Sequence, residues 1–214
     1  IAPELKATLG ITTEQYSWIV GAFQLAYTIF QPLCGWLIDV IGLKLGFMIC
    51  ATLWALACIA HAGAGSWLHL AMLRFFMGGA EAAATPANAK TIGEWFPKSE
   101  RPIAAGWAGV GFSIGAMLAP PIIYFAHASF GWQGAFMFTG ALALLWVILW
   151  WAFYQTPEKH PNLSNSELEY IKQDNEAPPV KQPFFTALKT VSKNKRFYGI
   201  AIPAFMAQPA WAVL

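Results

Sequence analysis

The chain has 214 residues, of which 57% are hydrophobic and 11% are charged. A soluble domain carries about a quarter charged residues, so this composition excludes an ordinary soluble domain and predicts a membrane protein. The formal net charge of +2 gives no reason to expect nucleic acid as a partner.

Five apolar runs are long enough to cross a bilayer, which takes roughly 20 helical residues for a hydrocarbon core of about 30 Å. A further run begins near residue 197. The sequence therefore predicts an all-α membrane protein whose five spans lie near residues 16–38, 43–62, 68–90, 103–127 and 133–155.

A polar segment at 156–196 predicts a linker with two short helices. Ser164 and Glu167 form a capping-box pattern at the start of the first helix. The second helix would carry apolar residues at helical spacing beside several lysines, which fits a helix on the membrane surface and equally a solvated helix. The residues of that pattern are Phe184, Phe185, Leu188 and Val191 with Lys189, Lys193 and Lys195.

Lysine and arginine are concentrated on one side of the predicted spans. Eleven of the 13 basic residues lie at the helix end Lys90 or in the segments 39–44, 91–102 and 156–196. Because cytoplasmic loops carry the excess of basic residues, the linker is predicted to be cytoplasmic. Residues 1–15 are then expected outside.

The chain ends and the cysteines give two further predictions. The N-terminal IAPELKATLG has neither an initiator Met nor a signal-peptide pattern, and the C-terminus lies inside an apolar run, so we expect a fragment of a longer protein. The cysteines Cys34, Cys50 and Cys58 lack metal-ligand spacing and are interpreted as packing residues, which predicts no metal site.

Two charges lie inside the third run, RFFMGGAEAAATPANAK. Arg74 and Glu81 are seven residues apart, so they share a helix face with about 10 Å between them along the axis. Each costs roughly 2.5–3.5 kcal/mol at the centre of a span. One interpretation is that each pairs with a neighbouring helix. The other is a polar cavity in which Arg74 meets an anion and Glu81 carries a proton.

An enzyme would need a nucleophile, a base or a metal cluster near these charges. The histidines His61, His69 and His127 lie at the outer ends of spans, where hydrogen-bonded interfacial side chains are expected instead. The sequence therefore predicts that the chain is not an enzyme.

The fourth run contains GVGFSIGAMLAPP. Its small residues Gly111, Gly115 and Ala119 share a stripe on which helices can approach closely. Pro120 and Pro121 then bend or weaken the helix. Together they predict a helix that rocks against a neighbour during gating.

The loop GWLIDVIGLK follows the first run. Asp39 lies near a helix end there, where it can cap the helix or pair with a basic residue. An ordinary short loop is the alternative interpretation.

Several motifs of the chain resemble those of a known family. GWLIDVIGLK, with Gly35, Asp39, Gly42 and Lys44, resembles the loop between the second and third spans of the major facilitator superfamily. LRFFMGGAEAAATP resembles its fourth-span signature. EWFPKSER and GFSIGAMLAPP resemble the anion:cation symporter branch. YSWIVGAFQLAYTIFQP and the tail ending QPAW resemble bacterial hexuronate transporters most.

The resemblance implies a fold of twelve spans in two six-helix halves. Residues 1–155 would be the N-terminal half without its first span, and 156–196 the cytoplasmic central linker. Residues 197–214 would begin the seventh span. The chain would act as a monomer in a bacterial inner membrane.

The resemblance also implies the function and the site. The protein would be a proton-coupled symporter that imports a sugar acid, most simply a hexuronate, without a cofactor. Alternatives are another organic anion, such as galactonate, glucarate or a small carboxylate, or a non-transporting membrane sensor. Substrate would meet Arg74, Tyr27, Gln31, Asn88 and Ser113; Glu81 would couple the proton; and Gly35, Asp39, Gly42, Lys44 and Arg101 would serve gating.

Overall fold

The computed structural model describes residues 2–174 and 182–213, and in this part every regular element is helical. The chain divides into two compact units, Ile1–Ala177 and Pro178–Leu214. The division falls inside the segment 156–196, which the sequence assigns to a linker. Residues 175–181 of that segment lie outside the described part.

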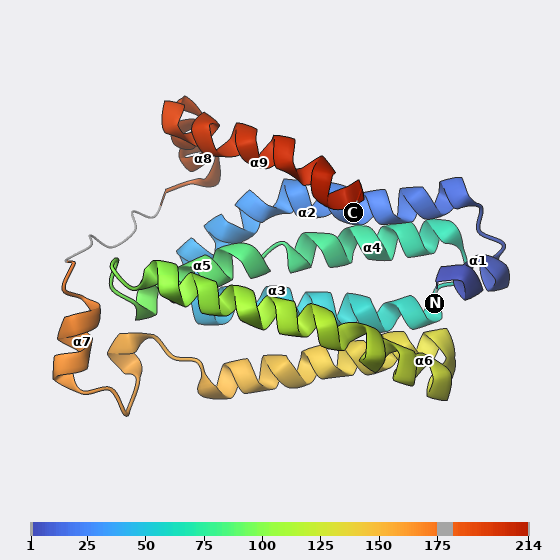
Figure 1. Cartoon of the computed structure of the whole chain (residues 1–214), viewed down its shortest axis with the longest axis horizontal. Helices are drawn as coiled ribbons and strands as arrows, with labels where there is room; N and C mark the ends of the chain where they lie inside the picture. Colours follow the sequence, from blue (N-terminus) through green and yellow to red (C-terminus); the bar gives the residue numbers. More distant parts are fainter. Residues whose placement is uncertain (1, 175–181, 214) are drawn as a thin grey trace. The chain divides into compact units, whose positions relative to one another are not determined.

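The first unit is a bundle of long helices (Figure 1). Its elements are listed here in chain order: α1 (Ala2–Leu9), α2 (Thr13–Ile41), α3 (Leu43–Ala60), α4 (Trp67–Glu81), α5 (Ala84–Trp95), α6 (Arg101–Phe153) and α7 (Asn165–Ile171). The most extensive helix contacts join α2 with α4 and α3 with α6. Two apolar cores form, and each lies near one end of the bundle.

The third predicted span is two helices rather than one. α4 ends at Glu81 and α5 begins at Ala84. Pro86 explains the break, because it has no N–H to donate to the carbonyl of Ala82 four residues earlier. The N–H of Ala83 instead donates to the carbonyl of Ala80 at 3.3 Å. The break therefore directly follows the acidic residue.

The fourth and fifth predicted spans are the two arms of α6. Gly131 separates them with a φ of 70° and a ψ of −177°, and the other interior residues of α6 keep helical angles. A positive φ is favoured only by glycine, which explains a sharp reversal at this residue. The chain turns between the predicted spans as expected, and the two prolines of the first arm lie within regular helix.

By length and composition, two helical segments of the described part can cross a membrane, Leu43–Gly63 and Arg101–Phe153. The second comprises two spans, since Gly131 divides it. α4 and α5 are each too short to be counted alone, with 15 and 12 residues. α2 is not among the segments that meet this test, so the first and third predicted spans stay predictions.

α7 lies against the turn between α5 and α6. The hydroxyl of Tyr170 donates to Glu100 at 2.6 Å, and the backbone N–H of Lys98 donates to Asp174 at 2.6 Å. Lys172 pairs with Glu158 at 2.9 Å, which lowers the pKa of the Glu158 carboxyl. The start of the predicted linker is therefore fastened to the helical bundle.

The predicted capping box of α7 is confirmed. The N–H of Glu167 donates to the Ser164 hydroxyl at 3.3 Å, and the N–H of Ser164 donates to the Glu167 carboxylate at 2.9 Å. Each group satisfies a backbone donor that the helix start leaves unpaired.

The second unit contains α8 (Phe184–Lys193) and α9 (Lys195–Val213). The hydroxyl of Tyr198 donates to the carbonyl of Ser192 at 2.9 Å and ties the two helices together. α8 confirms the predicted second linker helix, and its apolar residues Phe185, Leu188 and Val191 are exposed. Its position on a membrane surface stays a prediction.

Candidate functional site

Arg74 lies in the middle of α4, where Ser66 caps the helix start by accepting from the N–H of His69 at 3.2 Å. The α4 helix packs closely on α2 because it carries Gly78, where an added Cβ would lie 2.5 Å from the carbonyl oxygen of Phe23. This close approach holds the arginine at a fixed depth in the bundle. The glycines and alanines of RFFMGGAEAAATPANAK are expected from the sequence to let neighbouring helices pack closely, and the contact at Gly78 confirms this.

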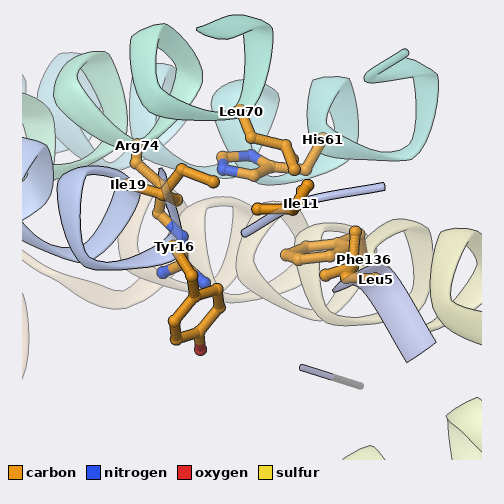
Figure 2. Close-up of a pocket in the computed structure, with 8 residues that line it drawn as sticks. All are labelled: Leu5, Ile11, Tyr16, Ile19, His61, Leu70, Arg74 and Phe136. Atoms are coloured by element: carbon orange, nitrogen blue, oxygen red, sulfur yellow. The ribbon is translucent and has the colours of Figure 1, made fainter. Parts of the chain in front are cut away.

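Arg74 lines a cavity of about 160 Å³ between α1, α2, α4, the turn after α3 and the second arm of α6. Five lining residues are apolar: Leu5, Ile11, Ile19, Leu70 and Phe136. The other two, Tyr16 and His61, are polar at one end. Figure 2 shows Arg74, Tyr16 and His61 among the lining residues, and each comes from a different element.

No counterion faces Arg74 in this cavity. Within residues 2–174 and 182–213, its half-buried guanidinium makes no hydrogen bond or ion pair. A second cation lies close by, because the ammonium group of Lys6 sits 4.9 Å from the centre of the Tyr16 ring. A cation among apolar walls without a counterion favours an anionic ligand.

The burial of His61 differs from the position that the sequence predicts. It was expected at the interface, but its side chain is completely buried. Its Nδ1 lies 2.7 Å from the carbonyl oxygen of Ala57, so the expected hydrogen bond is present. The ring stacks on Phe136 with 4.9 Å between centroids, and Nε2 has no partner among the described residues. The position of His61 at the end of an apolar run was the available signal.

The other two outer histidines differ from His61. His127 contacts the carboxylate of Glu4, which joins the first arm of α6 to α1. His69 is exposed, and its side chain does not line the cavity.

Glu81 is separate from the Arg74 cavity. It occupies the last position of α4, next to the break at Ala82 and Ala83, and does not line the cavity. Ala82 and Ala83 are completely buried and belong to a different core cluster from Leu5, Ile11, Ile19 and Leu70 of the cavity lining. Arg74 therefore lines the cavity and Glu81 does not, although the two charges still act on each other electrostatically. The role of Glu81 in proton coupling stays a prediction.

The remaining predicted substrate contacts lie outside the Arg74 cavity. The hydroxyls of Tyr27 and Thr85 share a hydrogen bond of 3.0 Å between α2 and α5. Gln31 follows one turn later on α2 and is half-buried. Asn88 lines a separate cavity of about 380 Å³ with walls rich in tryptophan. Ser113 donates to the carbonyl of Gly109 in its own helix and is exposed.

Asp39, in the last turn of α2, forms an ion pair with Lys90. The ammonium group of Lys90 lies 2.7 Å from Asp39 and donates to the carbonyl of Ile38 at 3.3 Å. The prediction that Asp39 pairs with a basic residue is thereby confirmed.

The other loop residues have structural contacts as well. An added Cβ at Gly35 would lie 3.5 Å from Pro86, and Gly42 has a φ of 93°. The carbonyl of Lys44 accepts from the Trp150 ring N–H at 3.1 Å. Arg101 donates to the carbonyls of Phe96 at 3.1 Å and Gly93 at 3.0 Å. These contacts fasten the ends of α2, α3, α5 and α6 at one side of the bundle.

The small-residue stripe on the first arm of α6 faces no described neighbour. An added Cβ at Gly111 or Gly115 would meet nothing within 4 Å. Pro120 and Pro121 are likewise exposed. The close packing and rocking assigned to these four residues stay predictions. No group of three or more His, Cys, Asp or Glu in the described ranges is arranged to hold a metal ion.

The comparison with known families is decisive for the class of protein. The family model of the Major Facilitator Superfamily matches residues 1–214. The chain belongs to this superfamily. The membership confirms the predicted all-α architecture, and the five predicted spans stay a prediction.

The chain is similar to several curated transporters of this superfamily. It is 44% identical to the hexuronate transporter of Escherichia coli strain K12 over 98% of the chain and 49% of that protein. It is 45% identical to the galacturonate transporter of Dickeya chrysanthemi over 98% of the chain and 61% of that protein. Identity to the D-galactonate transporter of Escherichia coli O6:H1 is 29%, over 98% of the chain and 51% of that protein. The chain thus spans about half the length of the relatives it matches.

Proposed function

We propose that this chain is part of a proton-coupled symporter that imports a hexuronate such as glucuronate or galacturonate by alternating access. The observation that carries the proposal is the half-buried Arg74, whose guanidinium faces a cavity without a counterion. The relatives named for hexuronate and galacturonate transport support the substrate class. Arg74 would hold the substrate carboxylate through its planar pair of donors.

Glu81 supplies the second part of the mechanism. Protonation of its carboxyl would favour the switch between the outward-open and inward-open states, because the neutral form is less costly to bury. The break after Glu81 lies where such a switch could be transmitted from α4 to α5. The proton gradient would drive uptake, so no cofactor is needed. The transporter would be a monomer in a bacterial inner membrane, with the linker cytoplasmic.

The test is uptake of radiolabelled galacturonate into proteoliposomes that contain the transporter under an imposed pH gradient. We expect Glu81→Gln to lose accumulation but to retain exchange of substrate across the membrane. Accumulation driven by the pH gradient in Glu81→Gln would remove Glu81 from the coupling step. Binding without any transport in the unchanged protein would favour a membrane sensor.

A second candidate substrate class is another organic anion. The chain is 33% identical to a probable sulfoacetate transporter of Cupriavidus necator, over 79% of the chain and 40% of that protein. The D-galactonate transporter represents a further class. Competition of unlabelled glucuronate, galactonate and sulfoacetate against galacturonate uptake separates these alternatives.

A further inference from the structure

His61 shares the Arg74 cavity, and its ring is held in one orientation. The ring is completely buried and stacks on Phe136 with an interplanar angle of 17°. Its Nδ1 lies 2.7 Å from the carbonyl oxygen of Ala57. A carbonyl oxygen can only accept, so the proton of this contact is on Nδ1. In the neutral ring, Nε2 is then the acceptor.

This acceptor is left without a partner. Nε2 is buried, and no donor among the described residues reaches it. Leaving a buried polar atom unpaired costs about 1–3 kcal/mol, so such an atom calls for an explanation. The surrounding side chains cannot provide one, because Leu70 and Phe136 carry no hydrogen-bond donor and Arg74 makes no bond to the ring.

Arg74 and His61 are complementary groups at the cavity, and a ligand reaches the buried Nε2 only when a neighbouring lining side chain shifts. Arg74 presents a cation with several donors, whereas His61 presents a single neutral acceptor. The cavity volume of about 160 Å³ is several times the ≈ 30 Å³ that one water occupies in the liquid. It can therefore take the acidic end of a ligand together with an adjoining group.

We propose that His61 is a specificity-determining residue whose Nε2 accepts a hydrogen bond from a hydroxyl of the substrate while Arg74 holds its carboxylate. The proposal rests on the proposed function and narrows its substrate class to acids that carry a hydroxyl close to the acidic group. A carboxylate or sulfonate without hydroxyls would leave Nε2 unpaired and would bind more weakly. Rejection of a ligand that lacks the matching polar group is the usual origin of such discrimination.

The test measures competition of single-deoxy galacturonates against radiolabelled galacturonate, with the transporter reconstituted in proteoliposomes. In the unchanged protein, removal of one particular hydroxyl should weaken binding by roughly tenfold, the expected effect of one lost hydrogen bond. His61→Phe keeps a ring that can stack on Phe136, and the carbonyl of Ala57 still accepts from the backbone N–H of residue 61. This variant should bind galacturonate roughly tenfold more weakly and should no longer distinguish that deoxy analogue from galacturonate.

Two further variants make the result specific. His61→Asn keeps a donor near the position of Nδ1 and removes Nε2, so it should reproduce the result and serves if His61→Phe does not fold. His69→Phe is the matched control, because His69 is exposed and lies outside the cavity lining. It should keep the discrimination pattern of the unchanged protein.

Three results would overturn the proposal. One is normal galacturonate affinity in both His61 variants. Another is an equal loss for galacturonate and every deoxy analogue, which would show a packing role only. The third is an unchanged protein that discriminates no hydroxyl. Arg74→Ala, measured beside them, tests the anion site itself. If this variant binds galacturonate and its deoxy analogues as tightly as the unchanged protein does, the proposed function is contradicted, whatever the His61 variants show.

Discussion

At the residue scale, the two charges of α4 differ in their surroundings. Arg74 faces a cavity bounded by apolar residues, and Glu81 lies at a helix break beside the buried Ala82 and Ala83. Because a charge is costly in an apolar environment, the proposed function assigns a ligand carboxylate to Arg74 and a proton to Glu81. The spacing in the sequence predicted the shared helix, whereas the separate surroundings depend on packing with distant elements.

The ion pair between Asp39 and Lys90 is expected to contribute little to stability. Asp39 is 54% exposed, so water and salt screen the interaction. We predict that Asp39→Asn lowers the free energy of unfolding by about 0.5 kcal/mol or less. Thermal unfolding in detergent, at low and high salt, measures the effect. A loss above about 2 kcal/mol that persists in high salt would contradict a screened pair.

At the element scale, the contact of α4 with α2 depends on a missing side chain. The Cβ of Gly78→Ala would lie 2.5 Å from the carbonyl oxygen of Phe23, so the two helices must move apart. We predict destabilisation by about 1–3 kcal/mol, the usual effect of overpacking. Thermal unfolding measures it, with Gly115→Ala as the matched control because its Cβ meets nothing within 4 Å. Equal stability of Gly78→Ala and the unchanged protein would contradict this close contact.

The capping box of α7 should respond to pH. Its hydrogen bond from the backbone of Ser164 lowers the pKa of Glu167. The ionised carboxyl therefore stabilises α7 above its usual pKa of about 4.3, and this contribution is lost as the pH falls through the lowered folded value. Hydrogen exchange of residues 165–171 should accelerate in Ser164→Ala, consistent with a cap worth about 1 kcal/mol. Unchanged exchange would show that α7 is held by its contacts with Glu100 and Lys98 alone.

The sequence predicted the elements better than their interruptions. Apolar runs and turn residues located the long helices, and the capping box located α7. The break after Glu81 was missed because it depends on a single proline inside an otherwise continuous run. The burial of His61 was missed for a different reason. It results from stacking on Phe136, 75 positions later in the sequence, which no local pattern reports.

At the scale of the whole molecule, the described bundle leaves one long apolar surface uncovered. Residues 109–122 of α6 are exposed over their whole length, including the stripe of Gly111 and Gly115. Transporters of this superfamily work by movement of one half against the other. If this stripe faces a moving neighbour, Gly115→Leu should reduce the rate of galacturonate exchange in proteoliposomes without lowering thermal stability. Wild-type exchange in Gly115→Leu would assign the stripe to a lipid-facing surface.

The proposed function depends most on Arg74 as the site of the substrate carboxylate. The most direct measurement is equilibrium binding of radiolabelled galacturonate to the purified transporter, compared between the unchanged protein and Arg74→Ala. A charge-assisted hydrogen-bonded pair is worth about 1.5–3 kcal/mol or more, so the account predicts an affinity loss of at least roughly tenfold. Thermal unfolding of the variant confirms that it is folded. Unchanged galacturonate affinity in a folded Arg74→Ala would contradict the account.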